Sequence, residues 1–172
     1  LKRKIYLVNC WLAITSYIGN TKGYKMVDEA LRDADIQKIV KEAVLESAAG
    51  LEKKFGFSSK EMSSYINDMI IKRYDDYNQE GINDPIARVS RQPIRKLSPD
   101  DRILGPANIA YEYGLPNDHL LYGAAYALKY DDPDDEEAVK LQESIQKDGI
   151  ENTIEKISGL QKGSDMFNKV LE

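Results

Sequence analysis

Two side chains near the start of the sequence have the types and the spacing for acid–base chemistry. Lys4 and Asn9 lie five residues apart, and Leu12 follows three residues later. On an α-helix, at about 100° per residue, these positions fall within one arc of ~140°, so one face would carry the lysine and the amide. A lysine beside an apolar wall can have a lowered pKa and act as a base. From spacing alone, however, an ordinary amphipathic helix is the favoured interpretation.

A second group of candidate residues is basic and lies in the middle of the chain. Its members are Arg88, Arg91, Arg95, Lys96 and, a little later, Arg102. No acid interrupts the first four, and the prolines at 93 and 99 predict a stretch outside a regular helix, which makes Arg95 and Lys96 the strongest candidates. Arginine suits bidentate binding of phosphate or carboxylate, so the segment predicts an anion site. The alternative is salt bridging to acids close in the sequence, namely Asp75, Asp76, Asp100 and Asp101.

Other common catalytic arrangements find little support. Cys10 is the one cysteine and His119 the one histidine, so a zinc site built from these residue types is not expected. His119 follows Asn117 at a predicted helix start, where a capping turn or a surface position is the simpler interpretation. Residues 19–23 contain two glycines and a lysine, but they follow a helix and lack the spacing of a phosphate or dinucleotide loop. We expect neither a metal site nor a nucleotide site.

The composition narrows the class of protein. With 42% hydrophobic and 31% charged residues, the 172-residue chain has enough apolar material for the core of one domain, residues 1–172. A net charge of −5 and a pI near 5.1 argue against nucleic-acid binding. The longest apolar stretch, residues 5–14, is too short to cross a bilayer, so no membrane partner is expected.

The expected location is cytoplasmic. A single cysteine cannot form an intramolecular disulfide, which favours a reducing compartment. The chain begins at Leu1 without a signal-like cleavage site, and it ends in Leu171 and Glu172, a pair typical of a cloning junction. We therefore expect a piece of a longer cytoplasmic protein.

Helical periodicity dominates the chain, and no segment alternates as a strand would, so the predicted fold class is all-α. The expected helices lie at about residues 4–18, 27–31, 36–55, 59–73, 86–90, 99–113, 118–130, 136–147 and 150–157. The expected helix starts are capped by Asp35, Ser58, Ser98, Asn117 and Asp132. Gly19 is expected to end the first helix, and Gly123 offers a small face for close packing.

Several motifs, in the same order along the chain, resemble one known family. Residues 4–9 (Lys-Ile-Tyr-Leu-Val-Asn) and 13–19 (Ala-Ile-Thr-Ser-Tyr-Ile-Gly) resemble the opening helix of the C-terminal domain of mannitol-1-phosphate 5-dehydrogenases, which are long-chain polyol dehydrogenases. Residues 88–102 are similar to the most distinctive segment of that family. Residues 112–116 and 157–160 match as well. The resemblance runs from about residue 2 to residue 160.

The resemblance implies a multi-helical substrate domain without the N-terminal Rossmann domain that binds NAD. It implies a metal-free enzyme that interconverts mannitol 1-phosphate and fructose 6-phosphate with NAD. The implied partners are the sugar phosphate and the chain's own N-terminal domain, and this fragment alone is expected to be inactive. The family signature is a lysine, an asparagine five residues later and a histidine three beyond. Lys4 and Asn9 match the first two, so the resemblance implies a general base and a hydrogen-bond donor at the reacting oxygen.

The sequence departs from the family at one signature position. Leu12 stands where the family has histidine, so one polar contact to substrate or to the lysine is missing. Two alternatives therefore stay open. One is a related sugar-acid oxidoreductase, similar to tagaturonate reductase, and the other is a non-catalytic helical module derived from the family.

Overall fold

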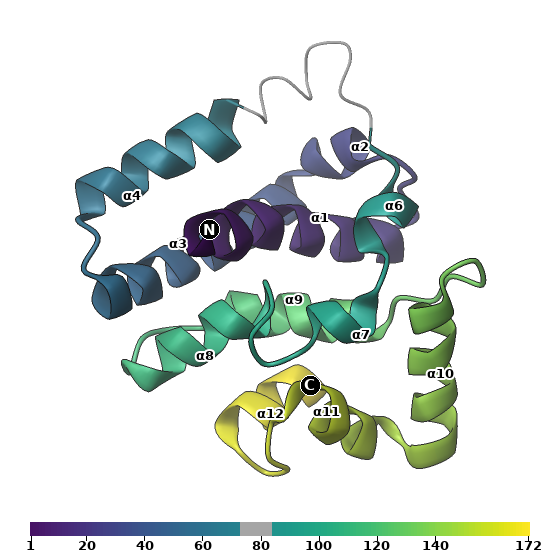
Figure 1. The fold of residues 1–172 in the computed structure, drawn as a ribbon. Helices are drawn as coiled ribbons and strands as arrows, with labels where there is room; N and C mark the ends of the chain where they lie inside the picture. The colour runs from purple at the N-terminus through teal and green to yellow at the C-terminus, as the bar shows by residue number, and fades with distance from the viewer. Residues whose placement is uncertain (73–83) are drawn as a thin grey trace.

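The protein is built of helices, as the computed structural model in Figure 1 shows for residues 1–72 and 84–172, the residues that the structure describes. Within these two stretches no strand occurs, and Met26 and Pro85 form an isolated bridge. The predicted all-α class is confirmed. No helix in the same stretches combines the length and the apolar character that crossing a membrane requires.

Two of the described elements are π-helices and the others are α-helices. In chain order they are η1 (Lys4–Asn9), α1 (Cys10–Thr21), α2 (Val27–Leu31), α3 (Ala34–Phe55), α4 (Ser59–Ile66), η2 (Asn67–Ile71), α6 (Ile86–Ser90), α7 (Pro93–Lys96), α8 (Leu104–Glu112), α9 (Asp118–Leu128), α10 (Glu136–Asp148), α11 (Ile150–Ser158) and α12 (Asp165–Leu171). The predicted bounds of α2 and α6 agree to the residue. Arg73, the expected end of the helix that begins as α4, lies outside the described residues, as do Asp75 and Asp76.

Helices α1 and α3 form the centre of the molecule. Helix α3 packs against α1, α8 and α9, and α1 also contacts α2, α6 and α9. In Figure 1, α4 lies above this centre, α8 and α9 lie below it, and α10 to α12 form the lower end. The α1–α9 contact depends on Gly123, because a Cβ at that position would lie 2.6 Å from Ile14 Cγ1. The predicted close-packing role of Gly123 is confirmed.

The first predicted helix is continuous, but its opening turn is wider than an α-helix. Residues 4–9 form the π-helix η1, and the Cys10 N–H donates to the Ile5 carbonyl five residues earlier. The Ser47 hydroxyl of α3 donates to the Tyr6 carbonyl at 2.6 Å and so supports this turn from outside. In a π-helical turn, two residues that are five positions apart lie more nearly one above the other along the helix axis than they do in an α-helix. The α-helical geometry assumed for the first turn is therefore wrong, while the shared face of Lys4 and Asn9 remains a prediction.

Gly19 does not end the first helix, which continues to Thr21. A Cβ on Gly19 would lie 2.7 Å from Ala30 Cβ and 2.9 Å from Ile86 Cδ1. The glycine therefore serves close packing, since its missing side chain lets α2 and α6 approach α1. A glycine inside a helix and one that ends a helix look alike in the sequence.

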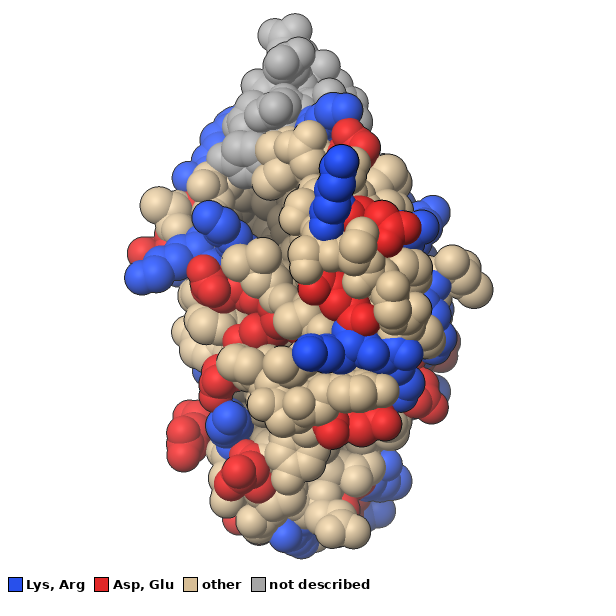
Figure 2. All heavy atoms as spheres, turned by 90° about the vertical axis from the view of Figure 1, so that its left-hand side faces the viewer, with Lys and Arg blue, Asp and Glu red and all other residues tan. Residues whose placement is uncertain are grey.

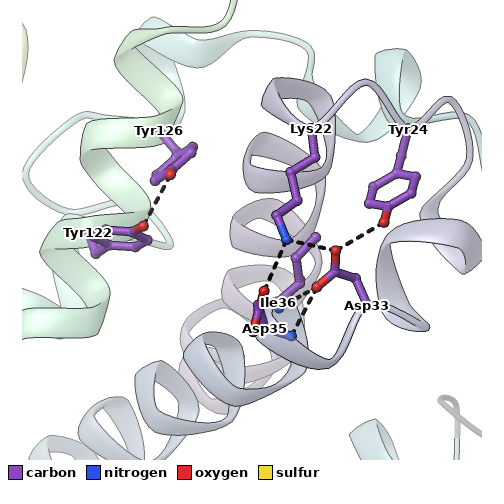
Figure 3. Close-up of polar contacts among 7 residues, drawn as sticks. All are labelled: Lys22, Tyr24, Asp33, Asp35, Ile36, Tyr122 and Tyr126. Atoms are coloured by element: carbon purple, nitrogen blue, oxygen red, sulfur yellow. Dashed lines mark hydrogen bonds and ion pairs between the residues drawn. The ribbon is translucent and has the colours of Figure 1, made fainter.

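The N-cap of α3 is Asp33, so the prediction of Asp35 is wrong. The Asp33 carboxylate accepts hydrogen bonds from the N–H groups of Asp35 at 2.9 Å and of Ile36 at 3.2 Å. Lys22 Nζ (2.7 Å) and the Tyr24 hydroxyl (3.0 Å) donate to the same carboxylate, as Figure 3 shows. The hydrogen bond from Lys22 is the main reason that the pKa of Asp33 is lowered to about 2.

Of the other predicted helix starts, the one at Ser58 is confirmed. Its hydroxyl accepts the Glu61 N–H at 3.2 Å, and the Glu61 carboxylate accepts the Ser58 N–H at 2.8 Å. The start predicted at Ser98 is wrong, because turns follow it and α8 begins only at Leu104. Pro106 stands in the first turn of α8, where its missing N–H leaves no helical bond unmade.

The caps predicted for α9 and α10 are also wrong. Asn117 precedes α9, but its side chain donates to the Ala107 carbonyl at 3.2 Å and leaves the helix N–H groups to another residue. Asp132 lies in a turn, and the N-cap of α10 is Asp135, which accepts the Glu137 N–H at 3.2 Å. Several residues able to cap stand within a few positions of each start, so the local pattern does not choose among them.

Two short helices were not predicted from the sequence. Helix α7 is a single turn with Pro93 at its first position, where proline is favoured. The prediction that the prolines hold Arg95 and Lys96 outside a helix is therefore wrong. Helix α12 begins after Ser164, whose hydroxyl accepts the Phe167 N–H at 3.3 Å.

Charged side chains of both signs are interspersed over the face on which α3 ends and α4 begins (Figure 2). The Lys54–Glu112 ion pair, with 2.9 Å between Nζ and Oε2, joins the end of α3 to the end of α8. This face therefore presents no extended patch of a single sign.

Candidate functional site

A cleft of about 260 Å³ lies where α1, α6, α7 and the turns before α8 meet. Its lining includes every sequence-predicted site residue except Lys4, namely Asn9, Arg88, Arg91, Arg95, Lys96 and Arg102. Leu12, Asp84 and Gln92 line it as well. The fold thus brings the end of the first π-helix to the basic segment, which lies some eighty residues later in the chain.

Asn9 is half-buried at the junction of η1 and α1. In the described part of the chain its amide makes no hydrogen bond, and it does not cap α1. A half-buried amide without a protein partner is available to a ligand. Leu12, one turn along α1, adds an apolar side chain to the same wall of the cleft.

Lys4 is the predicted site residue that the fold does not bring to the cleft. It is exposed at the other end of η1 and is not among the lining residues. Within residues 1–72 and 84–172, no apolar wall covers it. Any desolvation of Lys4 must therefore come from outside these residues.

Two members of the basic segment are partnered by acids. Arg88 pairs with Asp84 one turn away, and Arg102 Nε lies 2.7 Å from Asp101 Oδ1. For these two residues the predicted salt-bridge alternative holds, and the Asp101 partner is the one that the sequence suggests.

Arg91 and Arg95 differ from their neighbours in the basic segment. Both are exposed at the cleft, and neither guanidinium forms an ion pair with a described residue. A guanidinium stays charged throughout the physiological pH range. These two side chains are therefore the ones free to bind an anion.

Lys96 lies buried at the cleft, with 4% of its surface exposed. Its ammonium donates to the Val89 carbonyl and lies 5.9 Å from the centroid of the Tyr17 ring. Burial, together with the positive charges of Arg102 and Arg95, lowers the pKa of Lys96 to about 7. At neutral pH this lysine is thus only partly protonated, in contrast to the arginines around it.

Gln92 and Asp135 belong to this region, and the sequence analysis missed both. Gln92 has a positive φ of 62° and lines the cleft. Its N–H donates to Asp135 Oδ2 at 2.8 Å, across 43 residues of sequence. The position of Gln92 inside the basic segment could have suggested it, but no local signal points to Asp135.

The residues that the sequence analysis set aside lie elsewhere. Cys10 is buried, and its burial raises the pKa of the thiol well above the usual range. The ring of His119 contacts the buried Glu46 carboxylate, with 2.7 Å between Nδ1 and Oε1. Neither residue lines the cleft. Within the described stretches, no group of three or more His, Cys, Asp or Glu side chains is placed to hold a metal ion.

Other hollows of the molecule carry less chemistry. One of about 760 Å³ lies among α9, α10, α11 and α12, where the tilted rings of Tyr122 and Tyr126 have centroids 4.8 Å apart. Another, of about 270 Å³, is lined mainly by apolar side chains of α1, α3, α4 and η2. Neither combines a free amide with unpaired cations, so the cleft at Asn9 is the better candidate for a polar, anionic ligand.

The arrangement suits an anion that also carries a hydroxyl or carbonyl oxygen. Exposed guanidinium groups can hold a phosphate or carboxylate, and the Asn9 amide can donate to a hydroxyl or carbonyl oxygen some distance away. Among the described residues that line the cleft, Asp84 alone carries a carboxylate, and Arg88 partners it. The electrostatic balance of the site therefore favours a negatively charged ligand.

Comparison with known proteins gives one consistent result. Residues 1–172 match the family described as "Mannitol dehydrogenase C-terminal domain". A mannitol-1-phosphate 5-dehydrogenase of Exiguobacterium sp. is 40% identical over 172 residues, which cover 100% of this chain and 44% of the relative. The enzyme of the same name from Thermoanaerobacter pseudethanolicus is 37% identical, with 100% and 43% covered. That from Caldanaerobacter subterraneus subsp. tengcongensis is 33% identical over 170 residues, with 99% and 43% covered. The chain thus spans less than half the length of these relatives.

Proposed function

Because this chain belongs to the mannitol dehydrogenase C-terminal domain family, we propose that it is the substrate-binding half of an NAD-dependent oxidoreductase acting on mannitol 1-phosphate and fructose 6-phosphate. The observation that carries the proposal is the cleft that joins the free Asn9 amide to the unpaired guanidinium groups of Arg91 and Arg95. A cytoplasmic location and an N-terminal NAD-binding domain are parts of the same proposal. The length of the relatives supports the second of these.

The proposed reaction removes a hydride and a proton from a secondary alcohol. An NAD held by the N-terminal domain would supply the acceptor for that hydride. The described residues of this chain contain no strand that leads into a glycine-rich turn and a helix, so they do not fit a dinucleotide, and we assign NAD to the N-terminal domain. This chain supplies Lys4 as the acceptor of the hydroxyl proton and Asn9 as the donor to the oxygen as it becomes a carbonyl.

The exposure of Lys4 is compatible with this role only if a second domain covers it. In the described residues the Lys4 amine lacks the apolar surroundings that make a lysine a proton acceptor. Burial against an apolar surface of the N-terminal domain would favour the neutral amine and turn Lys4 into a proton acceptor. Asn9 at the other end of η1 would remain at the cleft, and Lys4, one π-turn before it, would reach the same substrate oxygen from the rim of the cleft.

The phosphate group is assigned to the exposed guanidinium groups. Arg91 and Arg95 are free to form charge-assisted hydrogen bonds, whereas Lys96 is buried and its ammonium is bonded to a carbonyl. Arg95 is therefore the strongest single candidate, and Lys96 contributes charge mainly below about pH 7. Arg88 and Arg102 would complete the site after leaving or sharing their acidic partners.

The test is Arg95→Ala in the full-length protein, assayed with phosphorylated and unphosphorylated substrates. A charge-assisted contact to phosphate contributes ~1.5–3 kcal/mol, so its loss raises the KM for mannitol 1-phosphate about 10–150-fold. The KM for unphosphorylated mannitol should change little. Lys140→Ala, which removes an exposed cation paired with Glu136 on α10, serves as the control. Equal weakening of both substrates would contradict the phosphate assignment.

Leu12 supports one competing proposal. It lines the cleft where the family resemblance calls for histidine, so the chain could be a binding module that has lost catalysis. Leu12→His in the full-length protein separates the binding module from the enzyme. If the wild type binds sugar phosphate without turnover and the variant gains turnover, the module is correct. Turnover by the wild type supports the enzyme, and preference for an unphosphorylated keto acid would support the reductase alternative.

A further inference from the structure

One residue of the cleft holds a backbone conformation that its own side chain opposes. Gln92 has φ 62° and ψ 57°, and it is the one residue other than glycine with a positive φ in residues 1–72 and 84–172. In this left-handed region the Cβ crowds the backbone, so such a residue persists only where its surroundings hold it. Gln92 joins α6 to α7. Its dihedral angles therefore set the directions of Arg91 on one side and Arg95 on the other.

The group that holds Gln92 is a carboxylate from a distant part of the chain. Asp135 Oδ2 accepts the Gln92 N–H at 2.8 Å, and Asp135 Oδ1 accepts the Glu137 N–H at 3.2 Å. With 7% of its surface exposed, Asp135 makes these bonds in a setting shielded from water, where they are stronger. One buried carboxylate thus begins α10 and holds Gln92 at the same time.

A second bond from α10 holds the following turn. Glu137 Oε2 accepts the Arg95 N–H at 3.0 Å, and α10 packs against α7. The Arg95 N–H lies in the first turn of α7, where no carbonyl of the same helix can accept it. The corner that carries Gln92 and Arg95 is therefore bound by two carboxylates of one helix terminus, and neither carboxylate lines the cleft.

We propose that Asp135 is a positioning residue of the cleft, which holds Gln92 in its left-handed conformation and so sets how Arg91 and Arg95 meet the substrate. This inference rests on the proposed function, because it takes the cleft to be the sugar-phosphate site. Asp135 acts through the Gln92 backbone and does not touch the substrate. Its effect should therefore appear in substrate binding more than in the chemical step.

The test uses Asp135→Asn in the full-length protein. The amide keeps the size of the side chain but has one accepting oxygen, so it cannot hold Gln92 and begin α10 as the carboxylate does. We expect kcat/KM for mannitol 1-phosphate to fall about 10–100-fold, mainly through KM, as for a misplaced binding group. Asp134→Asn removes the same charge one residue away, at an exposed position, and should stay within about twofold of the wild type.

A rescue variant separates positioning from general stability. Asparagine tolerates the left-handed region better than most residues and keeps an amide. Gln92→Asn combined with Asp135→Asn should therefore recover most of the lost kcat/KM. Gln92→Ile leaves Asp135 and the start of α10 intact, but its β-branched side chain opposes a positive φ. It should reproduce the loss even if Asp135→Asn does not fold, and Gln92→Asn, which tolerates this φ better, should cost clearly less than Gln92→Ile.

The possible outcomes separate this inference from the proposed function. A wild-type protein that turns over neither sugar phosphate overturns both. A wild type that is active, with Asp135→Asn no weaker than Asp134→Asn, overturns the positioning role alone. The same conclusion follows if the double variant does not recover, or if Gln92→Ile and Gln92→Asn behave alike. Melting temperatures of all variants ensure that folded protein is compared.

Discussion

The Glu46 carboxylate of α3 caps helix α9 from outside that helix, through His119. Glu46 Oε2 accepts the N–H groups of His119 and Leu120, each at 3.0 Å, and Oε1 lies 2.7 Å from His119 Nδ1. A carboxylate can only accept hydrogen bonds, so the ring nitrogen carries a hydrogen. Its negative charge also complements the partial positive charge at the start of α9. Two central helices are thereby joined at one buried side chain.

Glu46→Ala should destabilise the protein more than the loss of a surface residue. The backbone N–H groups of His119 and Leu120 would lose their acceptor, which costs ~1–3 kcal/mol. For a domain of this size the melting temperature should fall by about 2–12 °C. His119→Ala, which removes only the ring contact, should have a smaller effect. Calorimetry of both variants checks the order, and equal melting temperatures would contradict the capping role.

The decrease in the free energy of unfolding at acidic pH should depend on Asp33. Lys22, together with the start of α3, lowers the pKa of the Asp33 carboxyl to about 2, whereas an unfolded aspartate titrates near 4. The stabilisation is therefore present above pH ~4 and is lost as the pH falls through about 2. Asp33→Asn should flatten the decline in the free energy of unfolding over this interval. Urea titrations at several acidic pH values measure this free energy. Parallel pH profiles of the free energy for wild type and variant would count against the role of Asp33.

Gly123→Ala should destabilise the contact between α1 and α9. The new methyl group would lie 2.6 Å from Ile14 Cγ1 and 2.8 Å from its Cδ1, so one of the helices must shift. Overpacking of this kind costs ~1–3 kcal/mol. Ile14→Ala removes the opposing atoms, so the double variant should be more stable than the sum of the two single effects predicts. Strict additivity in chemical denaturation would argue that the contact is not tight.

Lys4→Ala in the full-length protein should remove most of the turnover. General acid–base catalysis contributes about 10²–10⁴-fold to the rate. No other described residue on η1 offers an amine in place of Lys4 to accept the proton. Lys4→Arg should be nearly as damaging, because a guanidinium keeps its proton at neutral pH. Lys140→Ala again controls for loss of a positive charge. A fall in kcat of less than about tenfold would contradict the assignment of Lys4 as the base.

Residues 1–172 alone should neither bind NAD nor catalyse the reaction. The described residues offer no strand, turn and helix of the dinucleotide-binding kind, and Lys4 is exposed without a second domain. Titration calorimetry of the isolated chain with NAD should give no heat of binding at micromolar concentrations. Adding the N-terminal domain, separately or in the full-length protein, should restore both properties. Micromolar NAD binding by the isolated chain would refute the division of roles.

Much of the helical framework follows from local sequence. The helix over residues 27–31 and the capping box of Ser58 and Glu61 depend on residues within one or two turns, and both are present as predicted. The end of α3 at Phe55 likewise follows from Gly56, which takes up the left-handed conformation there. Such features are visible in sequence because the interactions that produce them span only a few residues.

The composition of the cleft was also foreseeable in part. The basic segment and Asn9 are recognisable by residue type and family resemblance, and the fold gathers them around one cleft. The burial and the pairing of each basic side chain were not foreseeable. Whether a cation is free like Arg95, paired like Arg102 or buried like Lys96 depends on what packs around it.

The sequence by itself thus determined the all-α class, the approximate helices and the residue types of the candidate site. Only the tertiary structure decided which acid caps α9, why Gly19 lies inside a helix, and how Gln92 is held. Glu46 meets His119 across 73 residues, and Asp135 meets Gln92 across 43. These contacts exist because packing of the helices brings distant segments together, and no pattern of a few residues encodes that proximity.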